Sequence, residues 1–385
     1  MNARTLSRRG FARTLGAAVG AALVAPKLGT SLAEARLPSG TPEDVIQLNS
    51  NENPYGPSAK AREAMTRSQR AASRYPDALE SRVVEALAKL HGVEPANILL
   101  GCGSGEILRM ADMAFLGPGK TVVAAEPTFE AVLSYARVTR AEPVKVPLTR
   151  DFRHDLRAMA AACNERTGLV YICNPNNPTG TIVTREELAA FFPRVPSSAI
   201  ILVDEAYHHF VEDARYASSF EWVTSAWRVP NLVVVRTFSK VYGMAGMRLG
   251  YAVASKDNIR AMREHVVWNN SNAAVLEAVL ASLADPNHVP HHRKLNNDTR
   301  RWLCRELEKE GRRFIPSETN FVMIDAGGDV RPLLEQFRQR RILVGRRFHS
   351  IENWLRVSIG TRKEMEAFLA ALRALAPAAG ASRAA

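Results

Sequence analysis

Short apolar runs recur through the middle of the chain, each only a few residues long and nearly free of polar side chains. Six of them are rich in residues with high strand propensity: 98–100, 121–125, 169–173, 200–203, 232–235 and 249–254. A strand with one face in water alternates apolar and polar positions, whereas a strand covered on both faces reads as a continuous apolar run. The pattern therefore predicts a sheet that is buried on both faces.

Helical patterns lie between several of these runs. Residues 76–90 have a helical pattern that ends near His91-Gly92, and Thr184-Arg185-Glu186-Glu187 is a capping box, a motif that begins helices. Strands that alternate with helices are typical of α/β proteins, in which helices cover both faces of a sheet. We therefore expect an α/β fold, a three-layer sandwich with a mostly parallel central sheet.

Two flanking segments have a different pattern. Residues 37–70 contain a polar, proline-rich stretch at 49–57, which predicts an extended arm, and residues 290–375 predict a smaller α+β lobe of two helices and three shorter strands. We expect an arm over residues 36–70, a large domain over 71–285, a small C-terminal domain over 286–376 and a tail over 377–385. A cleft between two domains is a common place for a small-molecule site.

The first 35 residues have the pattern of an export signal. Ser7-Arg8-Arg9-Gly10-Phe11 contains two adjacent arginines, and the apolar run 14–26 that follows is shorter than the roughly 20 residues that a membrane span needs. Small residues around 31–35 offer cleavage sites. The segment resembles a twin-arginine (Tat) signal and predicts a periplasmic or exported protein, with the cytoplasm as the alternative if the signal does not function. We expect no stable membrane insertion after its removal.

The net charge of +12 raises the question of a nucleic-acid partner. Residues 1–36 contribute a net charge of +5, and the remaining excess lies in short clusters such as Arg346-Arg347. No aromatic residues interleave with these clusters to form a base-stacking platform, so we expect no nucleic-acid partner. The adjacent histidines at 208–209 and 291–292 lack a carboxylate at ligand spacing, and the four cysteines lack a CxxC pair, so we also expect no metal site.

Four polar segments come directly after predicted strands, and such segments meet at the carboxyl edge of a parallel sheet. They are Gly101-Cys102-Gly103-Ser104-Gly105-Glu106, Asn174-Pro175-Asn176-Asn177-Pro178-Thr179-Gly180, Asp204-Glu205-Ala206-Tyr207, and Thr237-Phe238-Ser239-Lys240 with Arg248 eight residues after the lysine.

These segments supply different chemical groups. A glycine-rich turn before a helix presents backbone N–H groups that bind phosphate. A carboxylate such as Asp204, at the end of a strand, faces the cleft and can keep a pyridine nitrogen protonated. A lysine that is partly removed from water beside Arg248 has a lowered pKa, which makes it a nucleophile. Taken alone, the glycine-rich and the proline-rich segments are better explained as ordinary turns and the Ser-Lys pair as an ordinary surface feature. The prediction of a cofactor site therefore rests on the combination and order of the segments.

In this order the motifs resemble those of the class I and II aminotransferases, pyridoxal-phosphate (PLP) enzymes of fold type I. The chain most resembles the histidinol-phosphate aminotransferase branch, through Asn49-Ser50-Asn51-Glu52-Asn53-Pro54-Tyr55-Gly56-Pro57 and Arg74-Tyr75-Pro76-Asp77. The resemblance runs from about residue 47 to about residue 375. It implies a homodimer that moves an amino group between an amino acid, or histidinol phosphate, and a 2-oxo acid.

The resemblance also implies a role for each site residue. Lys240 is implied to hold PLP as a Schiff base and to carry the transferred proton, and Asp204 to pair with the pyridine nitrogen. The other implied cofactor contacts are Asn177 and Tyr207 at the phenolic oxygen, Phe129 on the ring face, Ser104, Gly105, Thr237, Ser239 and Arg248 at the phosphate, and Tyr55 at the phosphate of the partner subunit.

Arg356 and Asn177 are implied to bind the substrate. Strand alternation places Arg356 on the face opposite Leu355 and Val357, away from the core. Gly345 stands where the histidinol-phosphate branch often has an arginine, and Arg346-Arg347 follow in shifted register. A phosphate dianion needs at least two such donors, so we expect an apolar or aromatic amino acid to be preferred over histidinol phosphate.

Two other functions remain open from the sequence. The same lysine and aspartate would serve a lyase, racemase, decarboxylase or oxidase, because the outcome depends on which Cα bond is held perpendicular to the ring. A non-catalytic PLP-binding protein is the third reading, and the intact pair of Lys240 and Asp204 argues against it.

Overall fold

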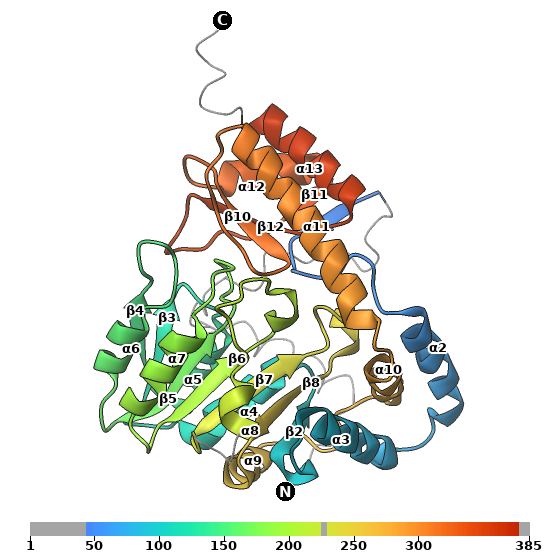
Figure 1. Ribbon diagram of the computed structural model, residues 1–385, viewed down its shortest axis with the longest axis vertical. Coiled ribbons are helices and arrows are strands. Elements are labelled where there is room, and N and C mark those ends of the chain that lie inside the picture. Colours follow the sequence, from blue (N-terminus) through green and yellow to red (C-terminus); the bar gives the residue numbers. More distant parts are fainter. Residues whose placement is uncertain (1–43, 225–228, 377–385) are drawn as a thin grey trace, which may run out of the picture. The chain divides into compact units, whose positions relative to one another are not determined.

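The computed structural model describes residues 44–224 and 229–376 (Figure 1). Its helices are α2 (Ala59–Ser68), α3 (Asp77–His91), α4 (Ser104–Phe115), α5 (Ala131–Thr139), α6 (Leu156–Ala162), α7 (Arg185–Phe191), α8 (Phe220–Thr224), α9 (Lys256–Arg263), α10 (Ala273–Leu283), α11 (His288–Lys309), α12 (Arg331–Gln339) and α13 (Arg362–Leu375). Its strands are β1 (Ile46–Leu48), β2 (Ile98–Gly101), β3 (Thr121–Glu126), β4 (Glu142–Pro147), β5 (Thr167–Cys173), β6 (Ile200–Asp204), β7 (Leu232–Thr237), β8 (Gly250–Ala254), β9 (Phe314–Ile315), β10 (Phe321–Asp325), β11 (Ile342–Val344) and β12 (Trp354–Ser358).

A mostly parallel sheet of seven strands forms the centre, in the order β2-β8-β7-β6-β5-β3-β4. β8 runs antiparallel to its neighbours β2 and β7, and the other neighbouring pairs are parallel. The six predicted strands are confirmed. The sequence pattern does not predict β4, because this strand contains polar residues and two prolines. It lies at the edge of the sheet, where proline is tolerated.

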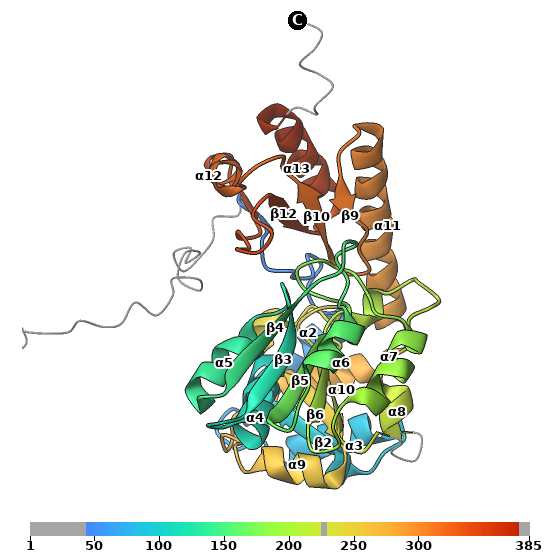
Figure 2. The same ribbon diagram turned by 90° about the vertical axis from the view of Figure 1, so that its left-hand side faces the viewer.

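Both faces of the sheet are covered, as the apolar runs predict. In β5, Leu169 and Tyr171 belong to the core under α4, α5 and α9, whereas Val170 and Ile172 belong to the core under α3, α6, α7 and α10. Figure 2 shows the strands between α4 and α5 on one side and α6 and α7 on the other. The three-layer α/β sandwich is therefore confirmed.

The C-terminal part contains more elements than the sequence pattern predicts. Residues 286–376, all of which the structure describes, form three helices and four strands, so the expectation of two helices and three strands is wrong. Short elements account for the difference, because β9 spans 2 residues and α12 spans 9, too few for a clear periodicity. β12, β10 and β9 form one antiparallel sheet, and β1 pairs with β11 in a separate parallel one.

The expected arm also contains a helix. Residues 49–58 form neither helix nor strand, but α2 follows, with the Ser58 side chain accepting a hydrogen bond from the backbone N–H of Ala61 as its cap. Ala61 and Ala64 are buried and supply the apolar face of this helix, which α10 contacts. The segment 59–68 is rich in alanine and charged residues of high helix propensity, so local preference and packing agree here.

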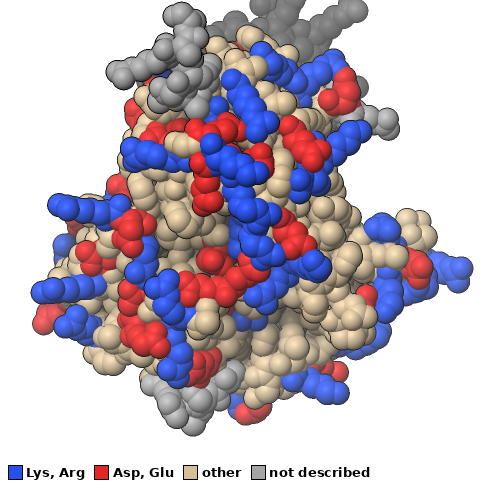
Figure 3. All heavy atoms as spheres, turned by 45° about the horizontal axis from the view of Figure 1, so that its top comes forward, with Lys and Arg blue, Asp and Glu red and all other residues tan. Residues whose placement is uncertain are grey.

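Some expectations concern residues outside the described ranges. The signal over residues 1–35 and the tail over 377–385 lie there, and the domain boundaries stay a prediction. Among the residues that the structure describes, no helix has the length and apolarity to cross a membrane. Basic and acidic side chains are interspersed over the face shown in Figure 3.

Candidate active site

The carboxyl ends of the parallel strands bring the predicted motifs together. Asp204 is the last residue of β6, Lys240 follows β7, and the segment with Asn177 follows β5. These three strands are neighbours in the sheet and run in the same direction. The residues therefore converge at one edge, as the order of the motifs predicts.

Lys240 is held against the arm. Its Nζ donates hydrogen bonds to the backbone oxygens of Asn51, at 3.0 Å, and Ser50, at 3.4 Å. Burial lowers the pKa of Lys240 to about 8, and the positive charges of Arg356 and Arg248 act in the same direction. A substantial fraction of this amine is therefore neutral and nucleophilic near pH 8.

Asp204 is a buried carboxylate whose partners are all neutral. Tyr171 donates its hydroxyl to Oδ2 at 3.0 Å, and the backbone N–H of Ala206 donates to Oδ1 at 3.1 Å. Burial raises the pKa of Asp204 to about 6, and these two hydrogen bonds oppose the shift. The neighbouring Glu205 faces away and forms a buried ion pair with Arg236 at 2.8 Å. Asp204 has no ion pair among the described residues, so a cationic ring nitrogen would complete its environment.

A hydrogen-bond network joins Tyr207 to Arg356, the predicted substrate arginine. The Tyr207 hydroxyl accepts from Nδ2 of Asn51 at 3.1 Å and from Nδ2 of Asn177 at 3.4 Å. Arg356 donates from Nη1 to Oδ1 of Asn177 at 2.7 Å and from Nη2 to the backbone oxygen of Asn49 at 3.0 Å. Asn177 thus lies between the predicted cofactor tyrosine and the predicted substrate arginine.

The glycine-rich turn lies beside Arg248. Gly103 caps α4 with a φ of +76°, and a Cβ built on it would lie 2.1 Å from Nη2 of Arg248. Arg248 also donates to Oγ of Ser239 at 3.4 Å, and the Thr237 hydroxyl donates to Oγ of Ser239 at 2.9 Å. Backbone N–H groups at a helix start, one guanidinium and two hydroxyls form a cradle suited to a phosphate dianion.

Two predicted residues lie apart from this network. Phe129 follows β3 and is 38% exposed, so its ring face is available to a ligand. Tyr55 is 36% exposed and packs edge-on against the ring of His292, at 6.2 Å between centroids. Among the described contacts, neither side chain bonds to Lys240 or Asp204.

Three residues of the network are not predicted by sequence reasoning. Asn51 bonds Tyr207, and Ser358 on β12 accepts the backbone N–H of Asn51 at 2.8 Å. Tyr171 bonds Asp204 from the middle of an apolar strand. Asn51 lies inside the arm motif that the sequence singles out, but no local pattern signals Tyr171 or Ser358, because their partners are distant in the chain.

The geometry fits PLP. The cradle at Gly103 has room only because this residue has no Cβ, and the buried Asp204 lacks a cation that a protonated pyridine would supply. Lys240 would supply the amine, and Tyr207 and Asn177 would supply donors for a ring oxygen. Among the residues that the structure describes, no group of three or more histidine, cysteine or carboxylate side chains could hold a metal ion.

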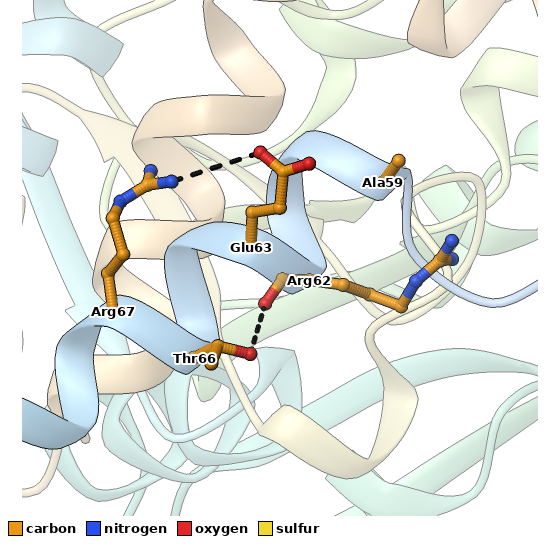
Figure 4. Close-up of a pocket in the computed structure, with 5 residues that line it drawn as sticks. All are labelled: Ala59, Arg62, Glu63, Thr66 and Arg67. Atoms are coloured by element: carbon orange, nitrogen blue, oxygen red, sulfur yellow. Dashed lines mark hydrogen bonds and ion pairs between the residues drawn. The ribbon is translucent and has the colours of Figure 1, made fainter.

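A surface hollow of about 440 Å³ lies elsewhere, against α2 (Figure 4). Its lining residues are Ala59, Arg62, Glu63, Thr66 and Arg67. All come from one helix, so a ligand there would be contacted from one side only, and we assign it no function.

Comparison with known proteins identifies the family. The sequence model of the family described as "Aminotransferase class I and II" matches residues 43–372. The chain belongs to this family. It is therefore an enzyme, a PLP-dependent aminotransferase, with fold type I.

Its relatives agree with this assignment. The chain is 41% identical to a histidinol-phosphate aminotransferase of Moorella thermoacetica, over 86% of this chain and 85% of that protein. It is 38% identical to histidinol-phosphate aminotransferase 2 of Ralstonia nicotianae, over 88% and 91%. The solved histidinol-phosphate aminotransferase of Sinorhizobium meliloti, in complex with pyridoxal-5'-phosphate, is 26% identical with a TM-score of 0.80, over 86% and 90%.

Proposed function

We propose that this aminotransferase takes its amino group from an α-amino acid whose carboxylate binds Arg356. The environment of Arg356 carries the proposal. Its side chain is buried, yet its Nε has no hydrogen-bond partner in the described part of the chain. Gly345 packs closely against this side chain, since a Cβ there would lie 3.1 Å from Nε. A carboxylate that accepts from Arg356 and from the Asn177 amide would satisfy this unpaired donor.

Under this proposal the cofactor contacts are those that the resemblance implies. Bound PLP supplies an aldehyde that condenses with amines and a ring that draws electrons from the substrate Cα. Asp204 would keep the ring nitrogen protonated, Tyr207 and Asn177 would donate to the ring oxygen, and Lys240 would hold and move the proton at the substrate Cα. The residues that would hold the phosphate are Ser104, the Gly105 N–H, Thr237, Ser239 and Arg248, and Phe129 would cover the ring face.

Histidinol phosphate is a second candidate donor. The names of the relatives favour it, since both curated relatives described above are histidinol-phosphate aminotransferases. Gly345 argues in the other direction, because it removes a cation from the position where that branch often has an arginine.

A direct comparison tests the proposal. We expect kcat/KM with 2-oxoglutarate as acceptor to be higher for an apolar or aromatic amino acid than for histidinol phosphate. Arg356→Lys keeps the positive charge but cannot form the bidentate hydrogen bonds of a guanidinium. It should therefore lower kcat/KM for the amino acid by about 10–100-fold, the cost of one or two charged hydrogen bonds. Its PLP content should not change. A tenfold preference for histidinol phosphate would refute the proposal.

The N-terminal residues support a proposed location. The arginine pair and the short apolar run of residues 7–26 would direct the folded, PLP-loaded enzyme out of the cytoplasm. Replacing Arg8 and Arg9 by lysine should leave the precursor inside the cell in a fractionation experiment. Processed protein outside the inner membrane at the normal level would contradict export by this route.

A further inference from the structure

Tyr171 carries a polar group in the middle of the apolar run 169–173. It is completely buried, and its ring belongs to the core under α4, α5 and α9. A buried hydroxyl costs free energy unless it forms a hydrogen bond, and a phenylalanine would fill the same space without that cost. The hydroxyl of Tyr171 therefore needs a partner, and its partner is Asp204.

The register of the sheet places Tyr171 next to Asp204. In the parallel pair of β5 and β6, Cys173 is opposite Asp204, and Tyr171 is opposite Leu202, two residues earlier on each strand. Side chains two residues apart on a strand point to the same face, so the long ring of Tyr171 reaches the carboxylate from the core side. Its hydroxyl donates to Oδ2 of Asp204 at 3.0 Å.

Two donors hold the carboxylate of Asp204, one on each oxygen. Tyr171 donates to Oδ2, and the backbone N–H of Ala206 donates to Oδ1 at 3.1 Å. Because the two bonds act on different oxygens, they fix the rotation of the carboxylate plane. Among the described residues, Tyr171 is the one side chain that donates to Asp204, since Sγ of Cys173 donates to the backbone oxygen of Pro175 instead.

The protonation of Asp204 depends on this bond. Burial raises the pKa of Asp204 to about 6, and the hydrogen bond from Tyr171 is the strongest of the influences that lower it. The bond from Ala206 and the charge of Lys240 lower it less, and Glu205 raises it. Burial and the charge of Asp204 raise the pKa of Tyr171, so its hydroxyl keeps its hydrogen and stays a donor. The titratable groups within range of Asp204 are Tyr171, Cys173, Glu205, Tyr207 and Lys240.

The bond also decides where a proton lies when a pyridine nitrogen faces Asp204. The nitrogen and the carboxylate would share one proton, which stays on the group with the higher proton affinity. Burial increases the proton affinity of a carboxylate, and a donor to its ionised form decreases it. Without that donor the proton would move to Asp204, and an unprotonated ring draws electrons from the substrate Cα less strongly.

We propose that Tyr171 is a positioning residue, which fixes the carboxylate of Asp204 and keeps the shared proton on the ring nitrogen of the cofactor. Because Tyr171 is completely buried, it acts through Asp204 and not on the cofactor directly. This inference rests on the role proposed for Asp204, and it is independent of the choice of amino donor.

Removal of a single oxygen atom tests the inference. Tyr171→Phe keeps the ring that packs in the core, so the fold should be retained. In the PLP-loaded variant, the nitrogen NMR shift of PLP labelled at its ring nitrogen should move from the protonated towards the unprotonated value. The single-turnover rate with an amino acid should fall about tenfold, which corresponds to one lost hydrogen bond to a charged group.

Tyr216→Phe is the matched control. The hydroxyl oxygen of Tyr216 is also buried, but it has no hydrogen-bond partner in the described part of the chain. Its removal should leave the nitrogen shift unchanged and the rate within twofold. A second background separates positioning from a general effect on the fold. When Asp204→Asn is already present, adding Tyr171→Phe should lower the rate by less than twofold, because the residue through which it acts is gone.

An unchanged nitrogen shift in Tyr171→Phe, whatever its rate, would overturn the inference. A tenfold loss of rate on adding Tyr171→Phe to Asp204→Asn would also overturn it, since such a loss would come from packing. Failure of the role proposed for Asp204 looks different, because the ring nitrogen would then stay protonated in Asp204→Asn itself.

Discussion

Burial acts on the two central residues of the site in opposite directions. It lowers the pKa of Lys240 to about 8 and raises that of Asp204 to about 6, because a buried site disfavours the charged form of each. Both shifts bring the group towards neutral pH. The larger neutral fraction of Lys240 favours reaction with an aldehyde. The ionised form of Asp204, which burial disfavours, is stabilised when a cation binds beside it.

The pKa of Lys240 predicts how PLP capture depends on pH. Capture requires the neutral amine, so its rate should rise about tenfold per pH unit below pH 8 and level off above it, as expected for a group with a pKa of about 8. PLP added to cofactor-free protein between pH 6 and pH 10 measures this rate. N-acetyl-lysine, with an ordinary lysine pKa, is the control and should show no plateau below pH 10. A rate that still rises steeply above pH 9.5 would contradict the assignment.

Lys240→Ala would remove both the proposed covalent link and the proposed proton carrier. We expect transamination to fall by at least 10²–10⁴-fold, the range for a lost acid–base group. Borohydride should no longer fix PLP to the protein, whereas circular dichroism should be unchanged, since Nζ bonds only backbone oxygens of the arm among its described partners. Lys89→Ala, on the exposed end of α3, is the matched control. A borohydride-fixed cofactor in the Lys240 variant would place the link elsewhere.

Residue positions differ in how well sequence predicts them. The alternation of 354–359 correctly places Arg356 opposite Leu355 and Val357, and it comes to lie against Asn177. Sequence spacing cannot predict the bond from Tyr171 to Asp204, because it depends on the register of two strands 33 residues apart. Contacts within a motif are predictable, and those between motifs require the fold.

At the scale of elements, the strands that matter for the site are those that sequence predicts best. β5, β6 and β7 are buried on both faces, so each reads as an apolar run, and the site residues follow their carboxyl ends. β4 is not predicted because it is not a continuous apolar run, and in the C-terminal part three strands are predicted where the structure has four, one of them, β9, only 2 residues long. The helix α2 is not predicted, because the prolines before it indicate extended structure. Ser58 nevertheless caps the first turn of this helix.

The turn between β2 and α4 predicts the effect of a single methyl group. Gly103→Ala places a Cβ against the Arg248 guanidinium, at a backbone conformation (φ +76°, ψ 164°) that essentially only glycine adopts and that costs another residue roughly 1–3 kcal/mol. We expect Arg248 to be displaced, the PLP dissociation constant to rise by about tenfold or more through the lost charged hydrogen bond, and the melting temperature to fall.

Gly117→Ala is the control for this change. Its Cβ would meet nothing within 4 Å, so PLP retention during dialysis should match the unmodified enzyme. Equal retention in the Gly103 variant would mean that this turn does not hold the phosphate.

At the scale of the whole molecule, the site leaves one predicted residue without a role inside its own chain. Tyr55 packs against His292 on α11 and bonds through its backbone to Asn53, and half-exposed tyrosines of this kind suit a contact with a second subunit. The resemblance implies that it reaches the phosphate of the partner. A symmetric dimer would then contain two sites, each built from both chains.

Mixing two inactive variants tests whether the sites are shared. Tyr55→Ala keeps Lys240, and Lys240→Ala keeps Tyr55, so a heterodimer of the two has one complete site and one site that lacks both residues. Random exchange of subunits in equal amounts makes half of the dimers mixed, so activity should recover to about one quarter of the unmodified enzyme if the sites span a twofold interface. The variants are unfolded together, refolded with PLP and assayed, with each variant refolded alone as the control. Because Lys240→Ala has no complete site of its own, recovery above the average of the two controls can come only from mixed dimers. Activity that stays at that average would mean that Tyr55 acts within its own chain or has no part in the site.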